Sequence, residues 1–220
     1  GVHRENYSSF ITRDTTIRGL DFKTKKFSVR PQDVHIYGMK LINNGAYRLT
    51  LNYLMMEGPG RKGSNVRVQN AEAKTEMYKV IMQDLTDYGL YQTGGHAHLS
   101  NVTISATAIQ KFTLFLNNEV VKLSVGSDSG SAMIFDGRAK AELYDVNCTS
   151  NENGCVRASG HRTKVYADNL YAFENEIDAD RLESQMLQNE TIYFATSAVE
   201  ARNRALLLIE NSYLADNQFM

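Results

Sequence analysis

Several features are scarce in this chain of 220 residues, and each absence argues against a class of protein. The sequence has two prolines, two cysteines and no tryptophan, and its 24 basic and 25 acidic residues leave a formal charge of −1. This balance lacks the basic surface with which nucleic-acid-binding proteins attract phosphates, so we expect no nucleic-acid partner. No apolar run approaches the roughly 18 residues of a transmembrane helix, so we expect no transmembrane segment.

What is present indicates a globular chain. Apolar residues make up 42% of the sequence and charged residues 22%, close to the averages of folded domains. The length suits one large domain, and we take residues 1–220 as a single domain.

Short alternating apolar runs dominate the chain, and four of them share one pattern. The pattern is visible when these residues serve as reference positions: Asn101, Asp145, Asn169 and Asn211. Small or apolar residues recur two and four positions before each reference and one and three positions after it. Fifteen of the sixteen positions fit, and only Ser212 does not. The references are 44, 24 and 42 residues apart, which we interpret as two, one and two turns of a repeat of roughly 22 residues.

The pattern predicts a parallel β-helix, an all-β solenoid. Apolar residues two apart lie on one face of a strand, and the change of phase at the reference residue requires a bend there. Asn and Asp suit such a bend because they tolerate left-handed backbone angles. Strands paired on both sides also leave little room for proline, which cannot donate to the ladder. A β-sandwich is the competing fold, and it does not predict the change of phase.

Parts of the chain depart from the repeat. We expect residues 57–63, around Pro59, to form a protruding loop, and residues 176–188 to form an irregular or helical excursion. The apolar end follows a regular coil directly, whereas solenoids have polar caps. We therefore expect the chain to be a fragment of a longer protein.

The units Gly89–Ile104 and Ala198–Leu214 resemble coils of pertactin-like autotransporter passenger domains. The resemblance is one of pattern and covers roughly residues 88–217. It implies a right-handed, pectin-lyase-like parallel β-helix on the surface of Gram-negative bacteria, acting as an adhesin or other virulence factor. Polysaccharide lyases and phage tailspikes share this architecture, so the resemblance says more about the fold than about the function.

The two cysteines lie close together. Cys148 and Cys155 flank a short segment containing Asn153-Gly154, which can take the positive φ that brings two Cα atoms within disulfide range. A disulfide would imply an oxidising compartment, and two unrelated thiols are the alternative. We expect no zinc site, because no histidine pair stands nearby at ligand spacing.

Outward positions of the repeat are the candidates for binding. Stacked coils place equivalent residues in columns and so predict a surface formed by Tyr144, Tyr166, Asp168, Tyr171, Glu210 and Tyr213. Tyrosines beside carboxylates offer flat apolar faces together with hydrogen bonds, which suits sugar rings or a protein partner. The other interpretation is that tyrosine simply suits an exposed strand.

Catalytic signals are weak. Glu142 and Asp168 belong to adjacent coils and could act as a glycosidase carboxylate pair. A lyase would need a basic residue, and four stand nearby, although they equally suit a soluble surface: Arg138, Lys140, Arg162 and Lys164. His96 and His98 lack a third ligand, so we expect neither a metal nor another cofactor.

Two hypotheses follow. The first is a non-catalytic segment of a secreted or surface-displayed bacterial protein that binds a host protein, a surface protein or a polysaccharide. The second is a carbohydrate-active β-helix, namely a polysaccharide lyase, a glycoside hydrolase or a tailspike carried on a virion. We favour the first, because no catalytic constellation rises above background.

Overall fold

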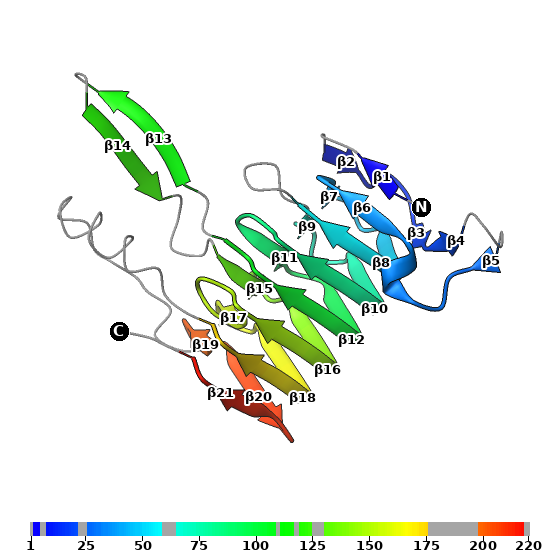
Figure 1. Cartoon of the computed structure of the whole chain (residues 1–220). Helices are drawn as coiled ribbons and strands as arrows, with labels where there is room; N and C mark the ends of the chain where they lie inside the picture. Colours follow the sequence, from blue (N-terminus) through cyan, green and yellow to red (C-terminus); the bar gives the residue numbers. More distant parts are fainter. Residues whose placement is uncertain are drawn as a thin grey trace.

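The computed structural model describes residues 2–4, 8–21, 26–58, 65–108, 111–116, 119–124, 130–175 and 198–217. The described chain is all-β, with one 3-10 helix at Pro31–Asp33 and no α-helix (Figure 1). Of the predicted loop at residues 57–63, only residues 57 and 58 belong to the described part of the chain. The predicted excursion at residues 176–188 lies wholly outside that part.

Two sheets contain most of the described strands. The large sheet has ten strands: β1 (Val2–Arg4), β3 (Thr15–Arg18), β6 (His35–Tyr37), β8 (Arg48–Glu57), β10 (Lys74–Gln83), β12 (His96–Ser105), β16 (Lys140–Thr149), β18 (Lys164–Phe173), β20 (Leu206–Glu210) and β21 (Tyr213–Ala215). The small sheet has seven: β2 (Ser8–Phe10), β7 (Lys40–Asn43), β9 (Asn65–Val68), β11 (Tyr88–Thr93), β15 (Ser131–Asp136), β17 (Val156–Ser159) and β19 (Val199–Arg202).

The pairing within both sheets is parallel, and from β6 to β20 the chain alternates between them. Two antiparallel pairs stand apart: β4 (Leu20–Asp21) with β5 (Lys26–Phe27), and β13 (Lys111–Leu116) with β14 (Glu119–Ser124). Parallel strands stacked in register on two alternating sheets fit the predicted β-helix.

The register corrects the predicted count of turns. β12 pairs directly with β16, so His98 and Glu142, 44 residues apart, are neighbours. Likewise β18 pairs directly with β20, across a separation of 42 residues. Each of these long intervals is therefore a single step of the stack and not the predicted two turns. The first contains the β13–β14 hairpin, inserted between β12 and β15.

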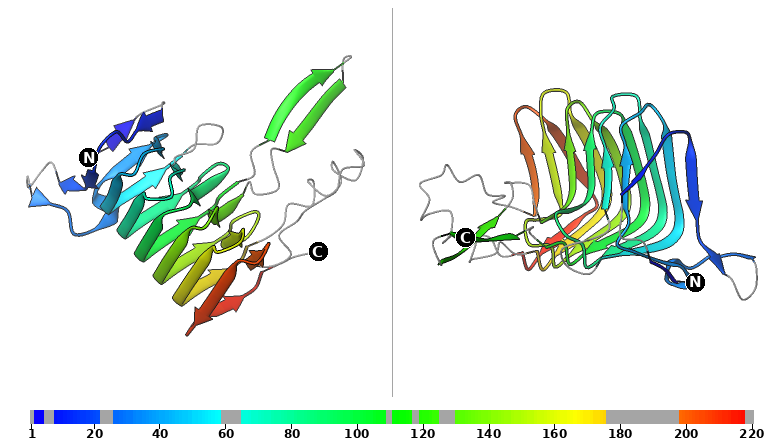
Figure 2. Two further views of the ribbon diagram at one scale, coloured as in Figure 1. Left: turned by 180° about the vertical axis from the view of Figure 1, so that it is seen from behind. Right: turned by 90° about the horizontal axis from the view of Figure 1, so that it is seen from above.

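The bend inside each long strand has the predicted left-handed backbone. Positive φ occurs at one equivalent residue in each coil of the large sheet, at Tyr53, Lys79, Asn101, Asp145, Asn169 and Asn211. The side chains two residues before and one residue after this position both point inward. Figure 2 shows the strands curving there onto a second face. Tyr53 and Lys79 belong to coils that the sequence did not reveal, because neither residue type signals a left-handed bend.

A second bend lies before each long strand. Gly94, Gly95, Gly137 and Gly160 all have positive φ at these corners. The space is also tight, because a Cβ on Gly95 would lie 2.3 Å from the carbonyl oxygen of Ala73. Both constraints require glycine at Gly95.

The predicted apolar columns form the core. Ala97, Leu99, Val102 and Ile104 are buried, as are their register partners in β16 and β18. In the last coil Leu207 and Ile209 are only partly buried, and Leu214 is 45% exposed. On the small sheet the column runs through Met133, which pairs with Leu90 and Val156. The next residue, Ile134, is also buried, although it lies on the face of β15 opposite to Met133.

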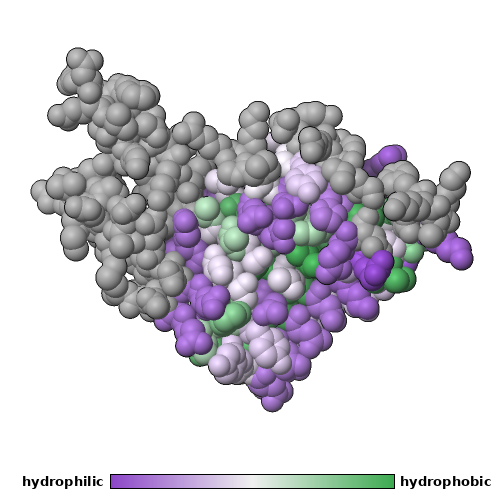
Figure 3. All heavy atoms as spheres, in the orientation of Figure 1, coloured by the Kyte–Doolittle hydropathy of each residue, from purple (hydrophilic) through white to green (hydrophobic). Residues whose placement is uncertain are grey.

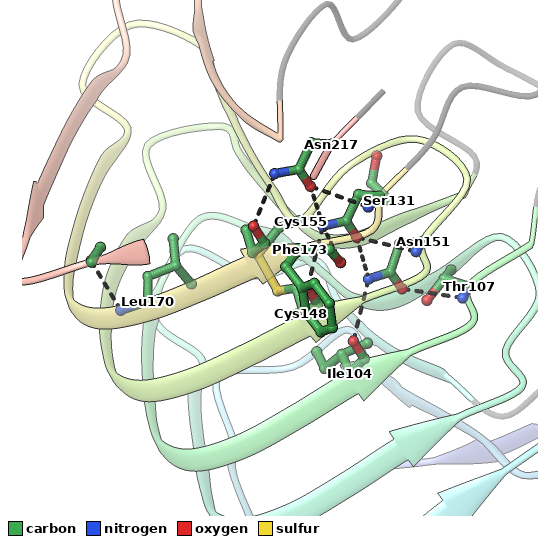
Figure 4. The surroundings of a disulfide bond; sticks show 12 residues. Ile104, Thr107, Ser131, Cys148, Asn151, Cys155, Leu170, Phe173 and Asn217 are labelled. Atoms are coloured by element: carbon green, nitrogen blue, oxygen red, sulfur yellow. Dashed lines mark hydrogen bonds between the residues drawn. A yellow bond between two sulfur atoms is a disulfide. The ribbon is translucent and has the colours of Figure 1, made fainter. Parts of the chain in front are cut away.

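A ladder of asparagines lines the corner after the long strands (Figure 4). Asn151 donates from Nδ2 to Oδ1 of Asn175 at 2.8 Å, and Asn175 donates in the same way to Asn217 at 2.9 Å. Each Oδ1 also accepts the backbone N–H of the coil before it, at 3.1 Å. Backbone groups that a turn leaves unpaired are thereby satisfied inside the stack.

The two cysteines form a disulfide beside this ladder (Figure 4). Cys148, at the end of β16, bonds to Cys155, just before β17, with the Cα atoms 5.3 Å apart. Both side chains are fully buried. The bond therefore fixes the corner between the large and the small sheet.

We expect Asn175→Ala to lower the free energy of unfolding by about 1–3 kcal/mol, because it removes the acceptor of the buried backbone N–H of Asn151 and one of the two acceptors of its Nδ2. Urea unfolding measures the change. Asn147, exposed on β16, provides the control, and Asn147→Ala should stay within about 0.5 kcal/mol of the parent. Equal effects of the two substitutions would contradict a stabilising ladder.

We expect the disulfide to stabilise the fold by about 2–3 kcal/mol, the loop-closure value for a bond across so short a segment. A reducing agent should lower the urea midpoint of the parent protein. The double variant Cys148→Ala, Cys155→Ala should have a low midpoint that reduction does not change. A parent midpoint that is insensitive to full reduction would refute this contribution.

Candidate functional site

The six predicted binding residues all lie on the outer face of the large sheet, the side opposite the core. Tyr144 lies on β16, Tyr166, Asp168 and Tyr171 on β18, Glu210 on β20 and Tyr213 on β21. Alternation along the strands places them there, because their neighbours Leu143, Ala167 and Leu170 point into the core. We call this set the tyrosine face.

The rings of His98, Tyr144 and Tyr166, on three adjacent strands, form a row of tilted and edge-to-face contacts that we call the aromatic stack. The ring centroids of His98 and Tyr144 are 5.5 Å apart, and those of Tyr144 and Tyr166 are 5.9 Å apart. Both distances lie in the range in which aromatic rings attract one another. These rings are half-buried or exposed, so the stack presents both ring edges and hydroxyl groups to solvent.

Beyond the bend, two tyrosines are more exposed. Tyr171 and Tyr213 are register partners on β18 and β21, and they are 43% and 56% exposed. Parallel strands stand about 4.8 Å apart, so the two side chains are neighbours. Together they form the most exposed aromatic pair of the tyrosine face.

Hydrogen bonds hold the acidic groups of the face in place. The hydroxyl of Tyr166 donates to Oε2 of Glu210 at 2.9 Å, and Asn211 donates from Nδ2 to Oδ1 of Asp168, also at 2.9 Å. The hydrogen bond to the Glu210 carboxylate raises the pKa of Tyr166 to about 12, because it favours the neutral phenol. Tyr166 and Glu210 therefore act as a fixed donor–acceptor pair across two strands.

The structure does not place Glu142 and Asp168 directly opposite each other. Glu142 pairs in register with Tyr166, and Asp168 pairs with Tyr144, so the two carboxylates occupy diagonal positions. Oε2 of Glu142 lies 3.2 Å from Nδ1 of His98. Each carboxylate thus already has a partner other than a substrate, which does not favour the glycosidase pair.

His96 and His98 are both exposed on β12. The described part of the chain contains no group of three metal-ligating side chains, and His98 has Glu142 as its neighbour.

The sequence did not predict a second aromatic group, near the N-terminal end of the stack. Tyr53 and Tyr78 meet edge to face at 5.3 Å, and Nζ of Lys79 lies 5.6 Å from the Tyr53 ring centre. The group lies before Asn101, the first of the four reference positions that define the repeat. Each of β8 and β10 contains a single aromatic residue, so the sequence offered no column to recognise.

Substitution of Glu210 tests the hydrogen bond to Tyr166. We expect Glu210→Gln to lower the pKa of Tyr166 from about 12 towards 10, because the acceptor loses its negative charge. The hydrogen bond is complete below pH 10 and is lost as pH rises through about 12. Ultraviolet difference titration measures this, with Tyr166→Phe to identify the signal. The control Glu72→Gln, at an exposed site elsewhere, should leave the titration curve unchanged. A titration curve of Glu210→Gln identical to that of the parent protein would rule out the contact.

Comparison with protein families, curated proteins and solved structures finds no match to this chain. In the described part of the chain, no helix has the length and apolar character needed to cross a membrane.

Proposed function

We propose that this chain is a non-catalytic segment of a right-handed parallel β-helix whose tyrosine face binds a partner outside the cell. The protein is secreted or displayed on a bacterial surface, in the manner of an autotransporter passenger domain with an adhesin or virulence role. The single observation that carries the proposal is the aromatic stack with exposed tyrosines on a regular sheet.

The scaffold supports binding because it preorganises the side chains. In-register pairing fixes each outward residue relative to its neighbours, so little conformational entropy is lost when a ligand docks. Tyrosine supplies a large, stiff contact surface together with a hydrogen-bonding group. A long ligand, such as a polysaccharide or an extended protein segment, could contact several coils at once.

The disulfide supports an extracytoplasmic location. Such bonds persist in oxidising compartments, including the bacterial periplasm and cell surface, and are rare in the cytosol.

A polysaccharide lyase, a hydrolase or a tailspike is the alternative, and no specific contact favours it. Its best candidates, Glu142 and Asp168, are diagonal to each other and already hydrogen-bonded.

The test combines a glycan and host-protein array with a cleavage assay. We expect the parent protein to bind without releasing new sugar ends, and Tyr171→Ala with Tyr213→Ala to weaken binding by about tenfold or more, since each removes an exposed aromatic contact. The control pair Phe10→Ala and Tyr47→Ala removes exposed aromatics that lie off the tyrosine face, and it should bind normally.

Two results would overturn the proposal. One is binding that the control pair weakens as much as the tyrosine pair does. The other is polysaccharide cleavage by the parent that Glu142→Gln or Asp168→Asn abolishes while the far-ultraviolet circular dichroism spectrum stays unchanged, because that result would establish an enzyme.

A further inference from the structure

Exposed cations line up at the corner that precedes the long strands. Lys140 and Lys164 are register partners at the first positions of β16 and β18. Two residues before these strands and β20 stand Arg138, Arg162 and Arg204, all exposed. We call these five residues the cation ridge. Figure 3 shows hydrophilic residues along the lower right edge of the molecule, which is the edge where the long strands bend in Figure 1.

None of the five side chains forms an ion pair with the rest of the described chain. The nearest carboxylates in sequence are otherwise engaged: Asp136 accepts the backbone N–H of Gly137 at 2.7 Å, and Glu142 contacts His98. The ridge thus gathers five positive charges that form no ion pair within the described part of a chain whose formal charge is −1.

Stability does not explain this arrangement. Like charges directly across a strand pair repel, so Lys140 opposite Lys164 is unfavourable for folding. The three arginines also have positive φ, at 76°, 73° and 66°, a conformation that non-glycine side chains adopt with strain. In the preceding coil the equivalent position, two residues before His96, is occupied by Gly94, so this corner can accommodate glycine. The arginines at this corner therefore stand in a backbone conformation that glycine would adopt with less strain.

The ridge borders the tyrosine face on the same strands. Lys164 stands two residues before Tyr166, and Lys140 two residues before Glu142, so all four side chains point to the same side. A ligand lying across β16, β18 and β20 would meet cations along one edge and aromatic rings beside them.

We propose that the cation ridge binds the carboxylate or sulfate groups of a linear acidic polysaccharide whose sugar rings lie on the tyrosine face. This inference rests on the proposed binding function and names its ligand class. Cations recur at the strand spacing of about 4.8 Å, so they can follow a regularly charged chain. Arginine pairs with such oxyanions in a two-pronged geometry, and lysine adds a point charge. The formal charge of −1 lacks the broad basic surface typical of a nucleic-acid-binding protein, so DNA serves as the comparison polymer.

Binding to defined polymers tests the inference. The probes are polygalacturonate for carboxylates, heparin for sulfates, dextran as a neutral polymer and single-stranded DNA as a phosphate polymer. We expect the parent protein to bind at least one acidic glycan more tightly than dextran or DNA. Affinity should fall as salt rises, because exposed charges are screened.

The matched variants each remove three positive charges. Lys140→Gln, Arg162→Gln and Lys164→Gln together should weaken acidic-glycan binding by about tenfold or more, from three charge contacts. Arg13→Gln, Lys26→Gln and Arg67→Gln, all exposed and away from the ridge, should leave it within about twofold. We expect the urea midpoint of the ridge variant to equal or exceed that of the parent, because like-charge repulsion is removed.

Three outcomes would overturn the inference: no binding to either acidic glycan at low salt, equal losses in the two variants, or tighter binding to DNA than to the glycans. Failure here is separable from failure of the proposed function. Array binding that depends on Tyr171 and Tyr213 but not on the ridge would leave the binding function intact and remove the acidic ligand.

Discussion

In-register parallel stacking is the constraint on which the rest of this structure depends. Each residue of β16 lies directly between its equivalents in β12 and β18, so every structural role is repeated from coil to coil. An inward residue must be apolar in each coil, a corner residue must tolerate a left-handed backbone in each coil, and an outward residue joins a column. The core, the asparagine ladder and the surface columns all follow from this single arrangement.

Stacking also explains how backbone groups at one corner find hydrogen-bond partners. A corner leaves backbone groups unpaired, and the ladder of Asn151, Asn175 and Asn217 supplies their partners from the next coil. The disulfide between Cys148 and Cys155 fixes the neighbouring corner covalently. Insertions are tolerated where the chain leaves the stack and returns to it in register, as around the β13–β14 hairpin.

The same repetition makes the outer face suited to binding. Tyrosine rings stack across strands, carboxylates are held by neighbours, and cations gather at the adjoining corner. Catalysis would require reactive groups facing each other at a defined separation. Columns of equivalent residues instead produce extended surfaces on which one type of side chain recurs. Extended stripes match an extended ligand better than a single reacting bond.

The sequence by itself determined the inward columns, the glycine corners and the bends at Asn and Asp, because these depend on local conformation and on alternation along a strand. It also pointed to the tyrosine columns. It did not reveal the earlier coils, in which Tyr53 and Lys79 occupy the left-handed position without a local preference for it. Nor could it distinguish one interrupted turn from two regular ones, since chain length says nothing about which strands pair. Only the tertiary structure decided that β12 lies against β16 and β18 against β20, because register is set by hydrogen bonds between distant segments. That same register decided that Glu142 faces Tyr166, that Cys148 reaches Cys155, and that five cations share one edge.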